Sequence, residues 1–153
     1  MDLVLNQLRC EETALTRSGP SKPSDARHGA NRLIIARGFL ESAKLQISSA
    51  QAGTLGNPIA ATVVNAAIAY TDALTATFAN KINQNDHAAV IKTLRDALGN
   101  RLPKSQETRL TRILGNKDLA QYGGRFMLLS DAESLFEQLK EYAEWVENEM
   151  IRR

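Results

Sequence analysis

The chain has 153 residues, of which 43% are hydrophobic and 24% charged, with a formal net charge of +2. This length favours one domain that buries roughly 70% of its unfolded surface without help from metals or disulfides. The single cysteine, Cys10, excludes an internal disulfide, so a reducing, cytoplasmic location is expected. No secretory signal and no membrane span are expected, because no uncharged apolar run approaches about 18 residues.

The first elements are predicted helices. A short opening helix ends at the loop Ser18–Pro23, so we divide the chain into an N-terminal segment, residues 1–23, and a helical bundle domain, residues 24–153. Ser24 is the predicted N-cap of the second helix. The inward face of this helix has apolar residues at three- and four-residue spacing: Leu33, Ile34, Ala36, Phe39, Leu40, Ala43 and Ile47.

A polar loop, residues 48–57, separates the second helix from a third that begins at Pro58. The third helix is apolar on nearly every face, which is typical of the central helix of a bundle. Asn65 and Asp72 form a thin polar stripe on it, beside small alanines that leave room for a close approach.

The rest of the chain predicts three more helices and one short helical turn. The turn Asn83–Asp86 resembles a capping box and is followed by a fourth helix that ends at Gly99. A fifth helix begins near Pro103, a single turn of helix covers 117–121, and Ser130 is the predicted N-cap of the last helix. No stretch alternates with a period of two, so the predicted fold is an all-α, up-and-down bundle of about five main helices plus the extra N-terminal helix.

His87 and Asp72 form the first candidate site. His87 shares a helix face with inward-facing apolar residues and lies in the first turn of its helix. The helix N-terminus disfavours an imidazolium, which would leave a neutral base that Asp72 can orient. The alternative is a half-buried histidine that only caps a helix junction.

Lys117, Tyr122 and Arg125 form the second candidate site. Two cations, a phenol and the pair Gly123-Gly124 make a reasonable phosphate-binding set. The alternative is an ordinary helix end, with the tyrosine ring packed and Gly123 as the C-cap. The sequence has no phosphate-binding glycine loop, and with two histidines and one cysteine no metal or cofactor is expected.

Charge is segregated between neighbouring segments. Residues 101–125 are mostly basic, and residues from Asp131 onward are mostly acidic. Such a pair of surfaces can steer anions or partner chains, or it can be two solvated helix faces. A helix-turn-helix in the basic segment is a weaker interpretation, because the break at Gly115-Asn116 does not follow that motif.

Several short segments resemble a bacterial HEPN-domain protein (higher eukaryotes and prokaryotes nucleotide-binding). They are Ala69–Leu74, Asn85–Val90, Leu114–Lys117 with Ala120–Tyr122, and Glu144–Glu147, and the similarity covers about residues 33–147. The resemblance implies an all-helical, often dimeric protein. Many members are metal-independent ribonucleases of toxin–antitoxin or defence systems, and others bind nucleotides or are inactive.

In the nuclease members an Arg precedes the catalytic His by five to seven positions. Here His87 takes the histidine place, but Asn80, Lys81 and Ile82 stand where the Arg is expected, and Lys81 supplies charge without the planar guanidinium. The resemblance therefore implies His87, Asp72 and Lys81 as catalytic candidates, and Lys117, Tyr122 and Arg125 as phosphate-binding candidates.

Two functions follow as hypotheses. The first is a HEPN-like protein that engages RNA or nucleotide phosphates as a homodimer, with His87 as general base if it cleaves RNA. The second is a non-catalytic interaction module, such as an antitoxin, an adaptor or a mobile-element accessory protein, that binds a cognate protein partner. Its expected surface is the acidic last helix or the polar face near Gln46–Gln51.

Overall fold

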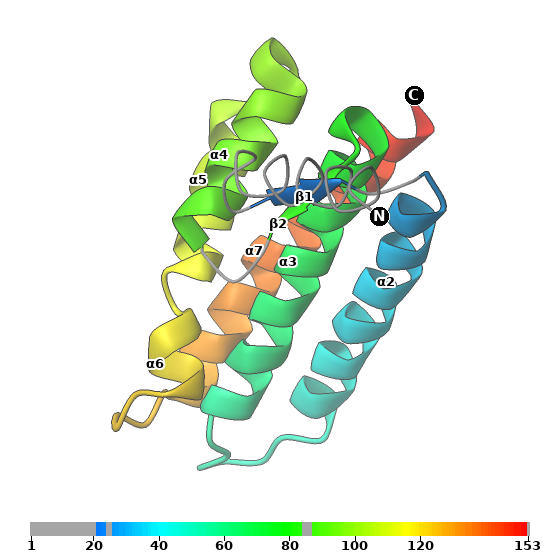
Figure 1. Ribbon diagram of the computed structural model, residues 1–153. Coiled ribbons are helices and arrows are strands. Elements are labelled where there is room, and N and C mark those ends of the chain that lie inside the picture. The colour runs from blue at the N-terminus through cyan, green and yellow to red at the C-terminus, as the bar shows by residue number, and fades with distance from the viewer. Residues whose placement is uncertain (1–20, 24–25, 84–86, 153) are drawn as a thin grey trace, which may run out of the picture.

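The computed structural model describes residues 21–23, 26–83 and 87–152, with side chains for 27–81 and 88–152. Its elements in chain order are β1 (Ser21–Pro23), α2 (Ala26–Ser48), α3 (Asn57–Ala79), β2 (Lys81–Asn83), α4 (His87–Leu98), η1 (Gly99–Arg101), α5 (Lys104–Leu114), α6 (Lys117–Gln121) and α7 (Leu129–Ile151) (Figure 1). The predicted all-α bundle is confirmed. The expected opening helix, the Ser24 cap and the turn at residues 84–86 lie outside the described residues.

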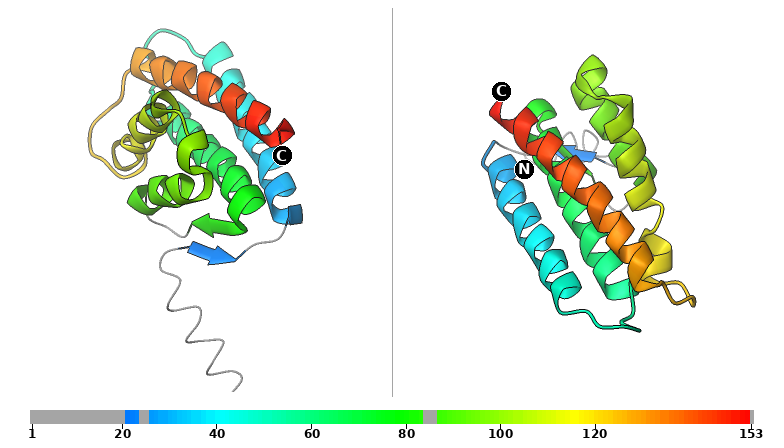
Figure 2. Two further views of the ribbon diagram at one scale, coloured as in Figure 1. Left: turned by 90° about the horizontal axis from the view of Figure 1, so that it is seen from above. Right: turned by 180° about the vertical axis from the view of Figure 1, so that it is seen from behind.

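Helix α3 is the centre of the bundle, as its composition predicts. Pro58 occupies its first turn, and its side chains are buried on nearly every face. Helices α2, α4, α6 and α7 all pack against it (Figures 1 and 2). In length and apolar composition α3 also passes as a candidate membrane span, but most of it is buried among the other helices, as a core helix is.

Helix α2 buries a narrower face than the sequence predicts. Leu33, Ala36 and Ala43 are buried against α3, whereas Ile34 is 64% exposed. The prediction of an inward Ile34 is wrong because α2 lies mainly against one neighbour, α3, and a helix with one main neighbour buries only a narrow stripe.

Two three-residue strands form an antiparallel ribbon that the sequence does not indicate. Ser21 pairs with Asn83 and Pro23 with Lys81, so Ser21–Pro23, expected to be loop, lie in a strand beside the bundle. The chain reaches β2 from α3 through Asn80, whose left-handed backbone (φ 52°) ends that helix. Asparagine tolerates this conformation better than most residues.

Some of the segregated charges pair with each other across neighbouring elements. Nη2 of Arg109 on α5 lies 2.9 Å from Oε2 of Glu141 on α7. Nη2 of Arg101 on η1 lies 2.9 Å from Oε2 of Glu149, also on α7. The basic segment and the acidic helix therefore neutralise part of each other's charge. Lys104, Arg112 and Arg125 remain exposed, so both interpretations of the pattern, surfaces that steer anions or partner chains and two solvated helix faces, stay open.

Candidate interaction site at the end of the bundle

The end of the bundle where α3 begins exposes four large apolar or aromatic side chains. Phe126 is 88% exposed, Tyr122 77%, Leu128 66% and Leu55 42%. Tyr122 follows α6, Phe126 and Leu128 lie in the loop before α7, and Leu55 lies in the loop before α3. We call these four residues the bundle-end surface. Clustered apolar exposure of this kind is typical of an interaction site.

Asn57, at the start of α3, holds the loop before α7 in place. Its Nδ2 donates to the carbonyl oxygens of Arg125 (3.1 Å) and Leu119 (3.3 Å), and its Oδ1 accepts a hydrogen bond of 2.7 Å from the amide of Met127. One side chain thus ties α6 and the following loop to the central helix.

Gly56 adds a backbone contact to the same loop. Its amide donates to the Met127 carbonyl at 2.8 Å. A Cβ at this position would lie 2.4 Å from the carbonyl oxygen of Leu128, so only glycine permits this approach.

Met127 anchors the loop in a small second core. It is 5% exposed and packs with Ile59, Ala60, Ala120 and Ala132. Because neighbouring side chains of an extended segment point to opposite sides, burial of Met127 turns Phe126 and Leu128 outward. The exposure of these two residues is therefore imposed by the anchoring of Met127.

The same anchoring moves the start of α7. The helix begins at Leu129, its N-cap is Leu128 with no side-chain capping bond, and the Ser130 carbonyl accepts a hydrogen bond from Ser134 within the helix. The predicted Ser130 N-cap is wrong, because the tertiary contacts of Met127 fix where the extended backbone ends.

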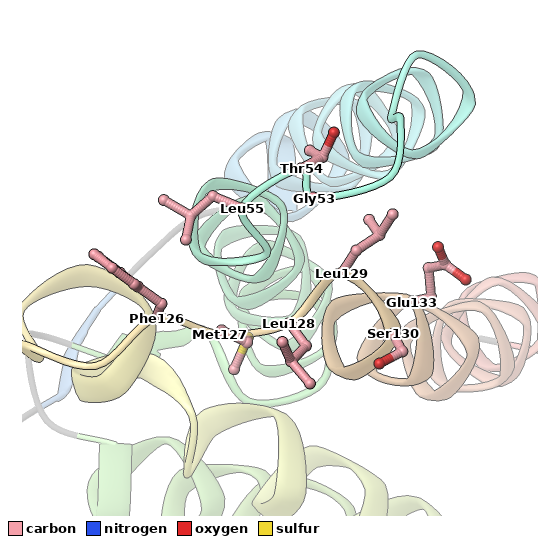
Figure 3. A pocket seen from close by; sticks show the side chains of 9 residues that line it. All are labelled: Gly53, Thr54, Leu55, Phe126, Met127, Leu128, Leu129, Ser130 and Glu133. Carbon is pink, nitrogen blue, oxygen red and sulfur yellow. The ribbon is translucent and has the colours of Figure 1, made fainter.

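Two shallow cavities flank the anchored loop. The larger, of about 490 Å³, is lined by Gly53, Thr54, Leu55, Phe126, Met127, Leu128, Leu129, Ser130 and Glu133 (Figure 3). The smaller, of about 290 Å³, includes Arg125 and Asp131 beside Phe126. Figure 3 shows Leu55 and Phe126 on one side of the larger cavity and Glu133 on the other.

The charge around this surface is balanced. Lys117 is half-buried and Arg125 exposed, and Asp118, Asp131 and Glu133 are exposed acids close to them in sequence or in the cavities. Lys117, Tyr122 and Arg125 thus lie at one end of the bundle, in or next to α6. Tyr122 does not pack its ring into the core, as the ordinary-helix-end alternative supposed.

Asp72 lies elsewhere. Its carboxylate is 3.0 Å from Nη2 of Arg32 on α2, and its side chain is 9% exposed. It stands fifteen residues beyond Asn57 on α3, which at 1.5 Å per residue is about 22 Å along the helix axis. The structure therefore does not bring Asp72 together with the end of α3 that carries the bundle-end surface.

His87 is the first residue of α4, and its side chain lies outside the described ones. The register of the α4–α5 hairpin still locates its backbone: Arg95 on α4 pairs with Glu107 on α5. Eight residues back from Arg95 is His87, and eight residues on from Glu107 is Gly115, about 12 Å in each case. The start of α4 is thus about level with the junction where Lys117 begins α6.

Lys81, the third catalytic candidate, is exposed in β2, opposite Pro23. Within the described residues, no group of three or more histidine, cysteine or acidic side chains could hold a metal ion. Comparison with protein-family models and with curated proteins finds no match for this chain.

Phe126 and Leu128 are not among the residues that the sequence predicts to be functional. A signal for them exists in the run Phe126–Leu129, four consecutive apolar residues directly after a pair of glycines and an arginine. A loop rarely carries such a run unless part of it is buried or contacts another chain.

Proposed function

We propose that this protein is a non-catalytic helical interaction module whose bundle-end surface pairs with a second copy of the chain. The observation that carries the proposal is the outward display of Phe126 and Leu128 by a loop that Asn57 and Gly56 fix to the central helix. A binding surface that is already ordered loses little conformational entropy on association.

Charge favours a second copy as the partner. The surface carries apolar side chains between cations and acids of similar number, and in a two-fold interface each patch meets itself. The cation Arg125 of one copy can then meet Asp131 or Glu133 of the other. Burying Phe126 and Leu128 in both copies contributes about 6–12 kcal/mol of apolar transfer free energy, at 1.5–3 kcal/mol for each side chain.

The test is the mass in solution of the full chain and of two double variants. The wild type should have twice the chain mass of 16.8 kDa, and Phe126→Ser with Leu128→Ser should give a folded monomer. The matched control is Ile34→Ser with Leu45→Ser, which removes two residues that are each 64% exposed on α2, and it should leave the dimer intact. A monomeric wild type, or a dimer lost only in the control, would refute the proposal.

A second candidate function rests on a different observation, the mixture of aromatic rings and cations at this end of the bundle. We propose, as the alternative, a HEPN-like cytoplasmic protein that engages RNA or nucleotide phosphates. Tyr122 and Phe126 offer exposed rings on which bases can stack, and Arg125 and Lys117 can contact phosphates. Helix α4 begins at about the same height along the bundle as Lys117, which supports a site that includes His87.

Binding of labelled single-stranded RNA at several salt concentrations tests this alternative. Lys117→Gln with Arg125→Gln should reduce the slope of log affinity against log salt by about 1.4, at 0.7 for each phosphate contact. Lys44→Gln on the outer face of α2 is the control and should change nothing. If the protein also cleaves RNA, His87→Ala should abolish cleavage and leave thermal stability nearly unchanged. Absence of RNA binding at low salt excludes this candidate and leaves the interaction module.

A further inference from the structure

A groove along the side of the bundle, between α2 and α7, carries features that neither proposed function uses. Figure 2 shows α7 running beside α2 across α3. The groove has a volume of about 390 Å³, which lies in the range of small-molecule sites. The residues that line it are Arg37, Leu40, Glu41, Tyr70, Lys140, Ala143, Glu144 and Glu147.

Tyr70 forms the floor of the groove, and the little surface it exposes opens there. The residue is 1% exposed, yet its hydroxyl makes no hydrogen bond to the described part of the chain. The hydroxyl is not one of the fully enclosed polar atoms without a partner, so it is accessible from the groove and can form a hydrogen bond with a water or with a ligand group there. Burial, and secondarily Glu147, raise the pKa of Tyr70 to about 12, and the phenol therefore stays protonated at neutral pH.

The cations at the rim are already engaged. Arg37 makes a two-pronged ion pair with Glu147, through bonds of 2.7 and 2.6 Å. Lys140 lies 2.9 Å from Glu137 and 5.5 Å from the centre of the Phe136 ring. Neither cation is therefore held by Glu41 or Glu144, the two remaining acids of the groove.

Glu41 and Glu144 make no ion pair within the described residues. With Leu40, Ala143 and the Tyr70 ring they form an apolar cleft whose rim carries three acids and two cations, the cations being the ones already paired with Glu147 and Glu137. An ammonium or guanidinium on an aliphatic stem matches this arrangement, because the stem contacts the apolar walls and the N–H groups meet carboxylates. The phenol oxygen of Tyr70 accepts a further N–H at the floor.

We propose that this α2–α7 groove binds an alkylammonium or alkylguanidinium group. The group can belong to a free amine or to a lysine or arginine side chain of a partner chain, since the recognising chemistry is the same. The proposal does not depend on the bundle-end surface, because the groove lies between helices and that surface lies on loops at one end of the bundle.

The experiment is an NMR titration of the full-length protein, followed through the backbone amide signals of Leu40 and Ala143, which line the groove and are present in every variant. The probes are n-butylamine, n-butylguanidine and, as the uncharged control with the same stem, 1-butanol. The two cationic probes should give saturable shifts that weaken as salt rises, and butanol should not. Glu41→Gln with Glu144→Gln should weaken binding about tenfold, and Tyr70→Phe should also weaken it. Asp96→Asn, an exposed acid on α4 that does not line the groove, should leave binding unchanged.

Equal binding of butanol and butylamine, or an unchanged dissociation constant in the Glu41→Gln, Glu144→Gln variant, would overturn the proposal. A capped Gly-Lys-Gly tripeptide distinguishes the two sources. Binding as strong as that of butylamine assigns the groove to a side chain of a partner, and binding of butylamine alone assigns it to a small amine.

Discussion

Asn57 makes three of the hydrogen bonds that hold the loop displaying Phe126, so replacing Asn57 by alanine tests how the surface is built. The substitution removes three hydrogen bonds and leaves the buried amide of Met127 without its acceptor. One of the three, at 3.3 Å, is long and weak. At about 1 kcal/mol for each full bond, Asn57→Ala should lower the free energy of unfolding by about 2 kcal/mol.

Urea denaturation followed by circular dichroism gives this free energy, and amide hydrogen exchange at Met127 reports on the loop directly. The matched control is Asn65→Ala, an asparagine on the same helix with no hydrogen bond from its side chain to the described residues, and it should change stability by less than about 0.5 kcal/mol. If Asn57→Ala is as stable as the control and the Met127 amide remains protected, the account of the loop is wrong.

Three further substitutions test other parts of the structure. Gly56→Ala should destabilise the protein by about 1–3 kcal/mol, because the added Cβ would collide with the backbone of Leu128. Its control Gly38→Ala, in open space on α2, should stabilise the protein by about 0.5–1 kcal/mol through helix propensity. Thermal unfolding measures both changes, and a Gly56→Ala variant that is also stabilised would contradict the packing at Gly56. Thr71→Val should lower the free energy of unfolding by about 1–3 kcal/mol, because the buried Tyr142 hydroxyl, 2.6 Å from Thr71 Oγ1, loses its partner. Adding Tyr142→Phe should recover part of this loss in chemical denaturation. A double variant less stable than Thr71→Val alone would count against the hydrogen bond. Arg95 lowers the pKa of Glu107 below its ordinary value of 4.5. The stability that this carboxylate contributes is therefore present above pH 4.5 and is lost as the pH falls through the lowered pKa. Glu107→Gln should lose less stability than the wild type on acidification below about pH 4.5, and identical profiles of stability against pH would contradict the ion pair.

The helices were predictable because their signals are local. Helical spacing of apolar residues, Pro58, and the breaks at Gly99 and Gly115 indicated every described α-helix, including the single turn Lys117–Gln121, but not the 3-10 helix Gly99–Arg101. The two-stranded ribbon was not predictable, since three-residue strands carry no periodicity. The predicted burial of Ile34 was wrong because the spacing of apolar residues does not show how many neighbouring helices pack against a helix.

The candidate site was only partly predictable. The sequence grouped Lys117, Tyr122 and Arg125, which lie together at one end of the bundle. It also associated Asp72 with His87; Asp72 makes an ion pair with Arg32, and the His87 side chain lies outside the described residues, so that association stays a prediction. The outward display of Phe126 and Leu128 arises from contacts of Met127 and Asn57, about 70 residues apart in the chain, and no local pattern encodes such a contact. Nor does charge segregation alone show that Arg109 meets Glu141.

Pairing of two copies through the bundle-end surface is tested most directly by an isotope-filtered NOE measurement on a sample that mixes labelled and unlabelled copies of the chain. Two copies joined at the bundle ends should give intermolecular NOEs from the ring of Phe126 and the methyl groups of Leu128 and Leu55. A sample without intermolecular NOEs at these residues, or with all of them on the outer face of α2 at Ile34 and Leu45, would contradict the account.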